Sequence, residues 1–226
     1  MRLDKLTIGS AKESLTHQFK NLKNVTIDFD EDHWITVVIG WNGTGKSNVL
    51  EALAIIFRDL IADKRAPEFA FQLAYRMGNG DSTLHFHIDA DPDREKEPLT
   101  IHVATDAEAK GEGSLIPFIE GEAPVSALRG KHVELTDFFA DQMRHLPRYV
   151  FSYYSGESPR MYEVFEPYLK SYYANLLKSK VDPEPKRLFY ALPVHSQFVL
   201  LAFLIQPDQA VKDLLEELGI DPNNGV

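Results

Sequence analysis

The sequence contains no cysteine, which excludes disulfide bonds and thiolate metal sites. It also has no run of about 18 uninterrupted apolar residues, and its amino terminus lacks the basic-then-apolar segment of a secretion signal. Neither membrane insertion nor secretion is therefore supported. Because a chain without cysteine fits a reducing compartment, we expect a cytoplasmic protein with no membrane partner.

The chain also lacks an excess of basic residues. Its 226 residues carry 24 Lys and Arg against 34 Asp and Glu, which gives a net charge of −10. Residues 1–66 hold nine of each sign, whereas residues 67–226 hold fifteen basic and twenty-five acidic residues. A single-module nucleic-acid binder usually shows a basic face, because neutralising phosphates supplies much of the affinity. Any contact with DNA must therefore come from local patches, partners or further sequence.

The stretch from Ile35 to Phe57 is the most informative part of the chain. An apolar, β-branched run over residues 35–39 predicts a strand, and residues 40–47 follow at once with the sequence GWNGTGKS. The spacing G-x-x-x-x-G-K-S is the phosphate-binding loop pattern. An apolar-periodic segment comes next, so the predicted order is strand, glycine loop, helix. The alternative is a chance glycine-rich turn.

Each position of this loop has a physical task. Gly40, Gly43 and Gly45 can adopt backbone conformations that allow successive N–H groups to surround an anion. Lys46 supplies a mobile positive charge for the β- and γ-phosphates and is our candidate catalytic residue, and the Ser47 hydroxyl is placed to ligate Mg²⁺. The helix that begins near Lys46 adds the partial positive charge of its N-terminus. We therefore expect ATP and Mg²⁺ here.

The helix after the loop needs an apolar face to hold it against a sheet. The residues that recur at helical spacing, and that we predict to pack there, are Leu50, Leu53, Ala54 and Phe57.

These segments resemble the head domains of RecF, SMC and related ABC-type ATPases of DNA repair and phage defence. In that group the loop reads G-x-N-G-x-G-K-S/T, followed by Asn, two hydrophobic residues, an acid and Ala. The chain matches this pattern at Asn42, Gly43, Gly45, Lys46, Ser47, Asn48, Glu51 and Ala52. The resemblance implies a nucleotide site formed by Gly40, Asn42, Gly43, Thr44, Gly45, Lys46, Ser47 and Asn48.

The resemblance also implies further contacts and partners. In these families a Phe-Lys-Asn segment, here residues 19–21, lies near the base and ribose, which makes Lys20 a candidate; a solvated loop lysine is at least as good an interpretation. Two heads of this kind enclose ATP as a homodimer and control DNA handling or an associated nuclease or other effector.

Alternating segments flank the loop. Residues 1–8 and 25–29 read as strands, and three further segments between residues 69 and 105 alternate with period two. Gly78-Asn79-Gly80-Asp81 is a hairpin turn signal. An antiparallel sheet follows, with an inward face made of Leu84, Phe86 and Ile88. The other face carries His85, His87 and Asp89, for which a metal site is the alternative to a polar outer face.

The predicted fold is α/β: a P-loop NTPase half-core at residues 1–66, an antiparallel β subdomain at 67–105, and a linker with a mainly helical region at 106–226. Within the last region we predict helices from residue 135, a strand near 148–156, a long helix beginning near residue 160, and two helices over 195–205 and 208–220. The long helix carries an apolar and aromatic stripe, read as packing in preference to base stacking: Met161, Phe165, Tyr168, Leu169, Tyr172 and Leu176. We expect Gly219 to cap the last helix and residues 221–226 to be a linker.

Two motifs of such hydrolases are not recognisable. A buried strand ending in Asp-Glu would complete the magnesium shell and orient water. Two segments come closest, but residues 84–91, with Asp89 and Asp91, alternate like a half-exposed strand, and in residues 198–208 Gln206 and Pro207 occupy the positions that need acids. Residues 154–157, Tyr-Ser-Gly-Glu, echo a signature loop with one glycine missing, and we interpret them as a turn. The chain then looks like the amino-terminal part of a longer ATPase, active only when completed.

Two other functions use the same loop. A non-hydrolytic module would bind nucleotide as a sensory or structural ligand and act through its partner. A phosphotransferase would need an acceptor site, to which nothing in the sequence points.

Overall fold

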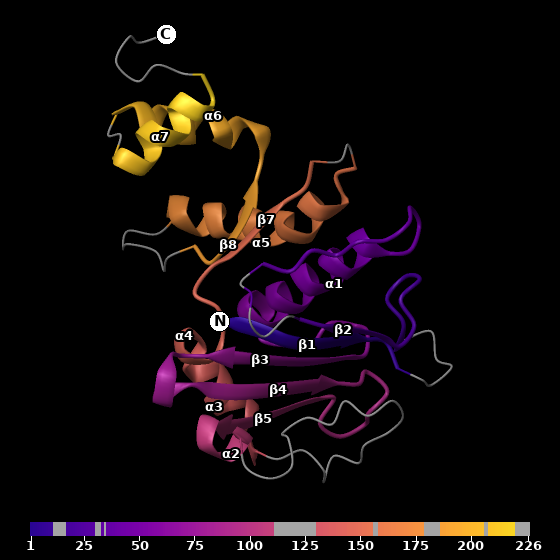
Figure 1. The fold of residues 1–226 in the computed structure, drawn as a ribbon. Coiled ribbons are helices and arrows are strands. Elements are labelled where there is room, and N and C mark those ends of the chain that lie inside the picture. The colour runs from indigo at the N-terminus through magenta and orange to yellow at the C-terminus, as the bar shows by residue number, and fades with distance from the viewer. Residues whose placement is uncertain are drawn as a thin grey trace.

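The computed structural model of the protein describes most of the chain: residues 1–10, 17–29, 33, 35–110, 130–155, 158–178, 186–205 and 208–219. A six-stranded sheet forms one half of the molecule, and a helical half with a small second sheet lies beyond α1 (Lys46–Arg58) (Figure 1). The chain is thus α/β with a mostly antiparallel sheet, in agreement with the predicted fold class.

The large sheet has the strand order β2-β1-β3-β4-β5-β6, and all neighbours are antiparallel. Its strands are β1 (Arg2–Ile8), β2 (Val25–Asp28), β3 (Phe71–Met77), β4 (Leu84–Ala90), β5 (Leu99–Thr105) and β6 (Lys131–His132). The register aligns Leu6, Leu73, Ile88 and Ile101 across four strands, and all four are fully buried. Because strand side chains alternate between faces, this row belongs to one core-facing surface.

The hairpin between β3 and β4 follows the predicted turn. Gly78 and Gly80 have φ of +97° and +55°, values that glycine adopts without a steric penalty. A Cβ on Gly78 would lie 2.6 Å from the Ser82 carbonyl oxygen, so the turn also requires the close approach that glycine allows. The sheet itself extends across the predicted boundary at residues 66 and 67, since β1 pairs with β3.

Helix α1 contributes one apolar face to the same core. Ala54 and Phe57 are buried and Leu53 is half-buried, as predicted, but Leu50 is exposed and the prediction for it was wrong. The buried stripe runs instead through Val49, Ala52 and Ile56. Glu51 is buried beside this stripe, which is unusual for a charged residue and is explained by its partners below.

The second half of the molecule contains a parallel strand pair. Strand β7 (Val150–Tyr153), predicted from the sequence, pairs in parallel with β8 (Leu188–Ala191), and the long helix α5 (Arg160–Lys178) connects them. The first turns of α5 are buried through Met161, Val164 and Phe165, whereas Leu176 is exposed. The predicted stripe is therefore packed over its first half.

The remaining helices are short or peripheral. They are η2, a π-helical turn (Asp59–Asp63), η3 (Gly80–Ser82), α2 (Asp106–Lys110), α3 (Leu135–Ala140), α4 (Gln142–His145), α6 (Pro193–Ile205) and α7 (Gln209–Glu217). Gly219, with φ of +74°, donates its N–H to the Glu216 carbonyl and caps α7 as predicted. Among the helices described, none combines the length and apolar character that crossing a bilayer requires. Residues 221–226 lie outside the described part.

The strand predicted over residues 35–39 is not formed. These residues belong to no ladder, and Ile35 and Ile39 are 78% and 88% exposed. A parallel strand needs hydrogen-bonding neighbours that come from distant parts of the chain, and the described residues place none beside this segment. The glycine loop and the helix after it do form where predicted.

Candidate functional site

The phosphate-loop pattern folds into a compact turn that ends at the first residue of α1. Gly43 and Gly45 have φ of +86° and +99°, in the left-handed region. A Cβ on Gly45 would lie 2.9 Å from Leu22 Cδ2 and 3.1 Å from both terminal side-chain atoms of Asn21, so this position combines a positive φ with close packing. Of the glycines predicted to shape the loop, Gly43 and Gly45 therefore have a steric reason to be there.

Lys46 extends its side chain back across the loop. Its Nζ donates to the carbonyl oxygens of Gly40 and Trp41, at 2.5 and 2.7 Å. The Thr44 hydroxyl also donates to the Trp41 carbonyl, at 2.8 Å. The ammonium group is thus held over the turn. From there it can leave the carbonyl oxygens and donate its hydrogen bonds to a bound anion instead.

The beginning of α1 reinforces this positive site. The helix has 13 residues and no acidic residue in its first turn, so no side-chain carboxylate neutralises the partial charge of its N-terminus there. Ser47 and Asn48 lie in that first turn and are half-buried, whereas Asn42 and Thr44 are exposed on the loop. The structure therefore brings the predicted loop residues together at one helix N-terminus, the arrangement that binds phosphate groups.

Segment 19–22 packs against the loop from the side. Asn48 donates through Nδ2 to Asn21 Oδ1 at 2.7 Å, and Asn21 Nδ2 donates to the Gly43 carbonyl at 3.4 Å. Lys20, whose φ is +54°, places its Nζ 2.5 and 2.6 Å from the two carboxylate oxygens of Glu51. Lys20 lies beside the site, but its charge is directed to a buried carboxylate. Its predicted contact with nucleotide stays a prediction.

Two residues of this neighbourhood were not recognised as partners from the sequence. Glu51 matched a family pattern but its ion pairing was not foreseen, and Arg160, at the start of α5, reaches both Asn48 and Glu51. No local pattern marks Arg160, because more than one hundred residues separate it from the loop. Only tertiary structure reveals this contact.

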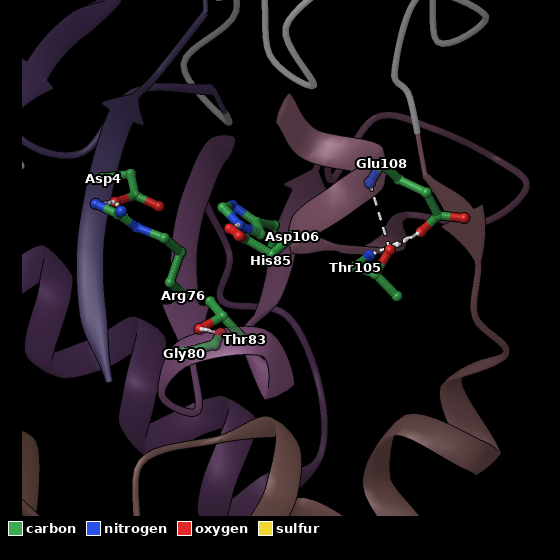
Figure 2. Close-up of polar contacts among 8 residues, drawn as sticks. All are labelled: Asp4, Arg76, Gly80, Thr83, His85, Thr105, Asp106 and Glu108. Carbon is green, nitrogen blue, oxygen red and sulfur yellow. Dashed lines mark hydrogen bonds and ion pairs between the residues drawn. The ribbon is translucent and has the colours of Figure 1, made fainter. Parts of the chain in front are cut away.

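The alternative metal site on β4 is not formed by the described residues, among which no group of three or more His, Asp or Glu could hold an ion. His85 Nε2 lies 3.1 Å from Asp106 Oδ1 (Figure 2), and Asp89 is paired with Arg94. His87 is 5% exposed, so the prediction of a polar outer face was wrong at this position. Burial lowers the His87 pKa to about 4, which keeps the ring neutral at neutral pH.

The inward face of β4 is confirmed for all three residues, because each belongs to the hydrophobic core or packs against it. Phe86 and Ile88 are buried, and Leu84 is half-buried. At the same end of the sheet, Arg76 forms an ion pair with Asp4 at 2.6 Å (Figure 2), which links β3 to β1. These contacts are structural.

A cleft of about 1120 Å³ lies away from the phosphate loop, between η2, α3, α4 and α5. Arg58 and Arg187, two of its lining cations, are already engaged: Arg58 with Asp59 and the Val164 carbonyl, Arg187 with Gln142 and the Pro147 carbonyl. Size alone does not make this cleft the functional site. The chemistry of the loop favours residues 40–48.

Four of the positions considered for the missing catalytic motifs lie outside the described residues, namely Gly156, Glu157, Gln206 and Pro207. Tyr154 and Ser155 follow β7 and belong to no helix or strand, and the interpretation of residues 154–157 as a turn stays a prediction. Asp89, in the other segment considered, forms an ion pair with Arg94, and Asp91 Oδ1 lies 2.9 Å from His17 Nε2.

Comparison with known proteins agrees with this geometry. Residues 17–113 match the family described as AAA ATPase domain, a segment that contains the loop, α1 and strands β2 to β5. Among curated proteins, none matches the sequence. The family match supports a P-loop ATPase domain of the AAA type at residues 17–113, and with it nucleotide binding.

Proposed function

We propose that this chain is the ATP-binding head of an ABC-type ATPase that resembles RecF and SMC proteins. The observation that carries the proposal is the loop at residues 40–47, where two glycines at positive φ, the Lys46 ammonium and the N-terminus of α1 converge. The family match over residues 17–113 supports nucleotide binding independently of that geometry.

The loop residues divide the work of holding a triphosphate. Gly40, Gly43 and Gly45 let the backbone come close to the phosphates, and Lys46 places its charge against the β- and γ-phosphates. Asn42 and Thr44, exposed on the loop, are available for further contacts. Mg²⁺ would be held by the Ser47 hydroxyl and would neutralise phosphate charge.

The wider role that we propose follows from the motif resemblance. In it, two heads form a homodimer around ATP and regulate a partner that acts on DNA, such as a nuclease, in DNA repair or phage defence in the cytoplasm. The proposed division is a P-loop core at 1–66, a β subdomain at 67–105 and a helical region at 106–226. The net charge of −10 is consistent with DNA contacts made mainly by the partner.

The test is the ATP affinity of Lys46→Ala, measured by titration calorimetry with Mg²⁺. A hydrogen bond to a charged group contributes about 1.5–3 kcal/mol, so we expect affinity to fall roughly 10- to 150-fold. Lys212→Ala, on the exposed surface of α7, is the matched control and should bind like the wild type. Equal affinity in wild type and a folded Lys46→Ala variant would overturn the assignment.

A second candidate is a module that binds nucleotide without hydrolysing it and signals to a partner. The ion pair of Asp89 with Arg94 and the contact of Asp91 Oδ1 with His17 Nε2 at 2.9 Å favour it, because both acids are engaged structurally. Such a module would share the ATP affinity of the head but show no turnover even when its natural partner is added.

A further inference from the structure

A chain of side-chain hydrogen bonds connects the start of α5 with the phosphate loop. Arg160 Nη1 donates to Asn48 Oδ1 at 3.1 Å, and Asn48 Nδ2 donates to Asn21 Oδ1 at 2.7 Å. Asn21 Nδ2 in turn donates to the Gly43 carbonyl oxygen at 3.4 Å. Residues from three separate parts of the sequence therefore form one continuous path to the loop.

The polarity of this path is set at both ends, by the donor-only guanidinium of Arg160 and by the carbonyl oxygen of Gly43, which can only accept. A guanidinium group has donors but no acceptor, so the side chain of Asn48 must turn its oxygen toward Arg160 and its amide nitrogen toward Asn21. Asn21 then has to accept with its oxygen, which leaves its amide nitrogen to donate to Gly43. Without Arg160, the Asn48 oxygen loses its donor, and of the contacts in this path only the one with Asn21 still holds the Asn48 side chain.

The last contact bears on the shape of the loop. The C=O of Gly43 and the N–H of Thr44 belong to one trans peptide, in which the two groups point in opposite directions. A bond that holds the Gly43 carbonyl therefore fixes the Gly43–Thr44 peptide plane. A Cβ on Gly45 would lie 3.1 Å from the Asn21 side chain, so Asn21 also packs against Gly45. It therefore contacts the loop at both glycines that have a positive φ.

A charged contact fixes the other end of the path. Arg160 Nε lies 3.9 Å from Glu51 Oε2, and the guanidinium carbon lies 5.5 Å from the centroid of the Tyr154 ring. Glu51 is only 6% exposed, and a buried carboxylate is tolerated when cations compensate its charge. Lys20 and Arg160 share that task, so the first residue of α5 is attached to the second turn of α1.

A second contact keeps the first turns of α5 aligned with α1. Arg58 Nη1, at the end of α1, donates to the Val164 carbonyl of α5 at 3.2 Å. The buried Met161 and Phe165 lie on the same turns. The beginning of α5 is therefore held at two points along α1.

We propose that Arg160 is a positioning residue that couples α5 to the phosphate loop, so that nucleotide binding at residues 40–47 and the position of the first turns of α5 influence each other. This inference rests on the proposed nucleotide site. Because coupling between two sites is reciprocal, phosphates that order the loop strengthen the path, and an intact path raises the affinity for nucleotide.

The first experiment measures Mg²⁺-ATP affinity of the 226-residue chain by calorimetry for wild type, Arg160→Gln and Arg148→Gln. Arg148 is a matched control, because it is exposed and also lies over a tyrosine ring, that of Tyr149, at 5.2 Å. We expect Arg160→Gln to bind roughly tenfold more weakly, within the usual range of coupling, and Arg148→Gln to bind like the wild type. Arg160→Lys keeps a donor-only cation and should recover part of the loss.

A double-mutant cycle separates coupling from a general loss of structure. If the path is continuous, Asn21→Ala already interrupts it, and adding Arg160→Gln should change ATP affinity less than twofold further. Independent contributions would instead multiply. Multiplicative losses would overturn the proposal, and so would an Arg160→Gln variant that binds ATP within twofold of the wild type.

Hydrogen exchange provides the readout that a merely structural role would not change. In the wild type, ATP should slow amide exchange both in the loop and in residues 160–165; in Arg160→Gln at saturating ATP, only the loop should respond. If Arg160→Gln does not fold, the same comparison is made with Arg160→Lys and Asn21→Ala. Protection of residues 160–165 that is unaltered in both variants would overturn the coupling. A wild type that binds no ATP, or that binds no better than Lys46→Ala, would instead refute the nucleotide site itself.

Discussion

Leu73 on β3 and Ile39 just before the phosphate loop both belong to apolar segments with a strand-like sequence, yet their surroundings differ. Leu73 is fully buried, with β1 and β4 paired on its two sides, whereas Ile39 is 88% exposed and pairs with no strand. The difference is not in the residues. It lies in whether neighbouring strands meet the segment: β4 from the adjacent sequence and β1 from the distant amino terminus pair with β3, whereas no described strand lies beside Ile39.

The antiparallel sheet largely obtains its neighbours locally, through the hairpin at residues 78–83 and the connection between β4 and β5. A parallel strand needs partners from distant segments, since a crossover connection is required. The described residues contain one such pair, β7 with β8, and even there Phe151 is 72% exposed and stacks on Phe189 with the ring centroids 4.7 Å apart. The core-facing apolar side chains of the large sheet are covered by other described residues, whereas apolar side chains around the phosphate loop remain exposed.

The largest expected effect tests this contrast in stability. Phe86 stacks on Tyr75 in the core of the sheet with the ring centroids 5.0 Å apart, and Phe86→Ala should lower the free energy of unfolding by about 3–5 kcal/mol. The matched change on the exposed parallel pair, Phe151→Ala, should cost within about 0.5 kcal/mol. Urea unfolding measures both. Similar costs at the two positions would remove the contrast.

The next effect concerns turnover. If the loop region needs further groups to become catalytic, the 226-residue chain should bind ATP but hydrolyse it about a hundred- to a thousand-fold more slowly than a complete enzyme, the usual cost of losing one transition-state donor. Steady-state phosphate release, with Lys46→Ala as the contamination control, measures it. Turnover of about one per second or faster, abolished in Lys46→Ala, would show that this region is already complete.

A smaller effect is expected from pH. Burial holds the His87 pKa at about 4 in the folded chain, below its value of about 6.5 in the unfolded chain. Between these values the unfolded chain binds more protons, so the contribution of His87 to stability is present above about pH 6.5 and is lost as pH falls toward 4. The loss should be about 2 kcal/mol at about pH 5.

Denaturant unfolding at about pH 7.5 and pH 5 measures the pH effect. His87→Gln should reduce the difference between the two conditions, and His33→Gln, on the exposed surface, should leave it unchanged. Burial also lowers the pKa of the cross-strand neighbour His102, so some pH dependence should remain in His87→Gln. Full pH dependence in His87→Gln would show that the outer face of the sheet does not behave as a buried surface.

Much of the site could be predicted from the sequence, because its determinants are local. The glycine spacing, Lys46 and the start of α1 lie within a few residues of one another, and the structure places them together. The alternation at β3 to β5, with glycines at the β3–β4 turn, likewise predicted the sheet core. Such patterns depend on side-chain periodicity and on backbone freedom at particular residues, which tertiary contacts leave unchanged.

Other features were decided by contacts between distant segments. The pairing of β1 with β3 and of β7 with β8, the burial of His87, the exposure of Leu50 and the reach of Arg160 to Glu51 and Asn48 all depend on which segments meet. The apolar run at 35–39 has a strand-like pattern but no strand beside it among the described residues, so the pattern alone did not produce a strand. A sequence pattern specifies which face of a segment can be buried, whereas pairing and burial require a second surface that only the folded chain provides.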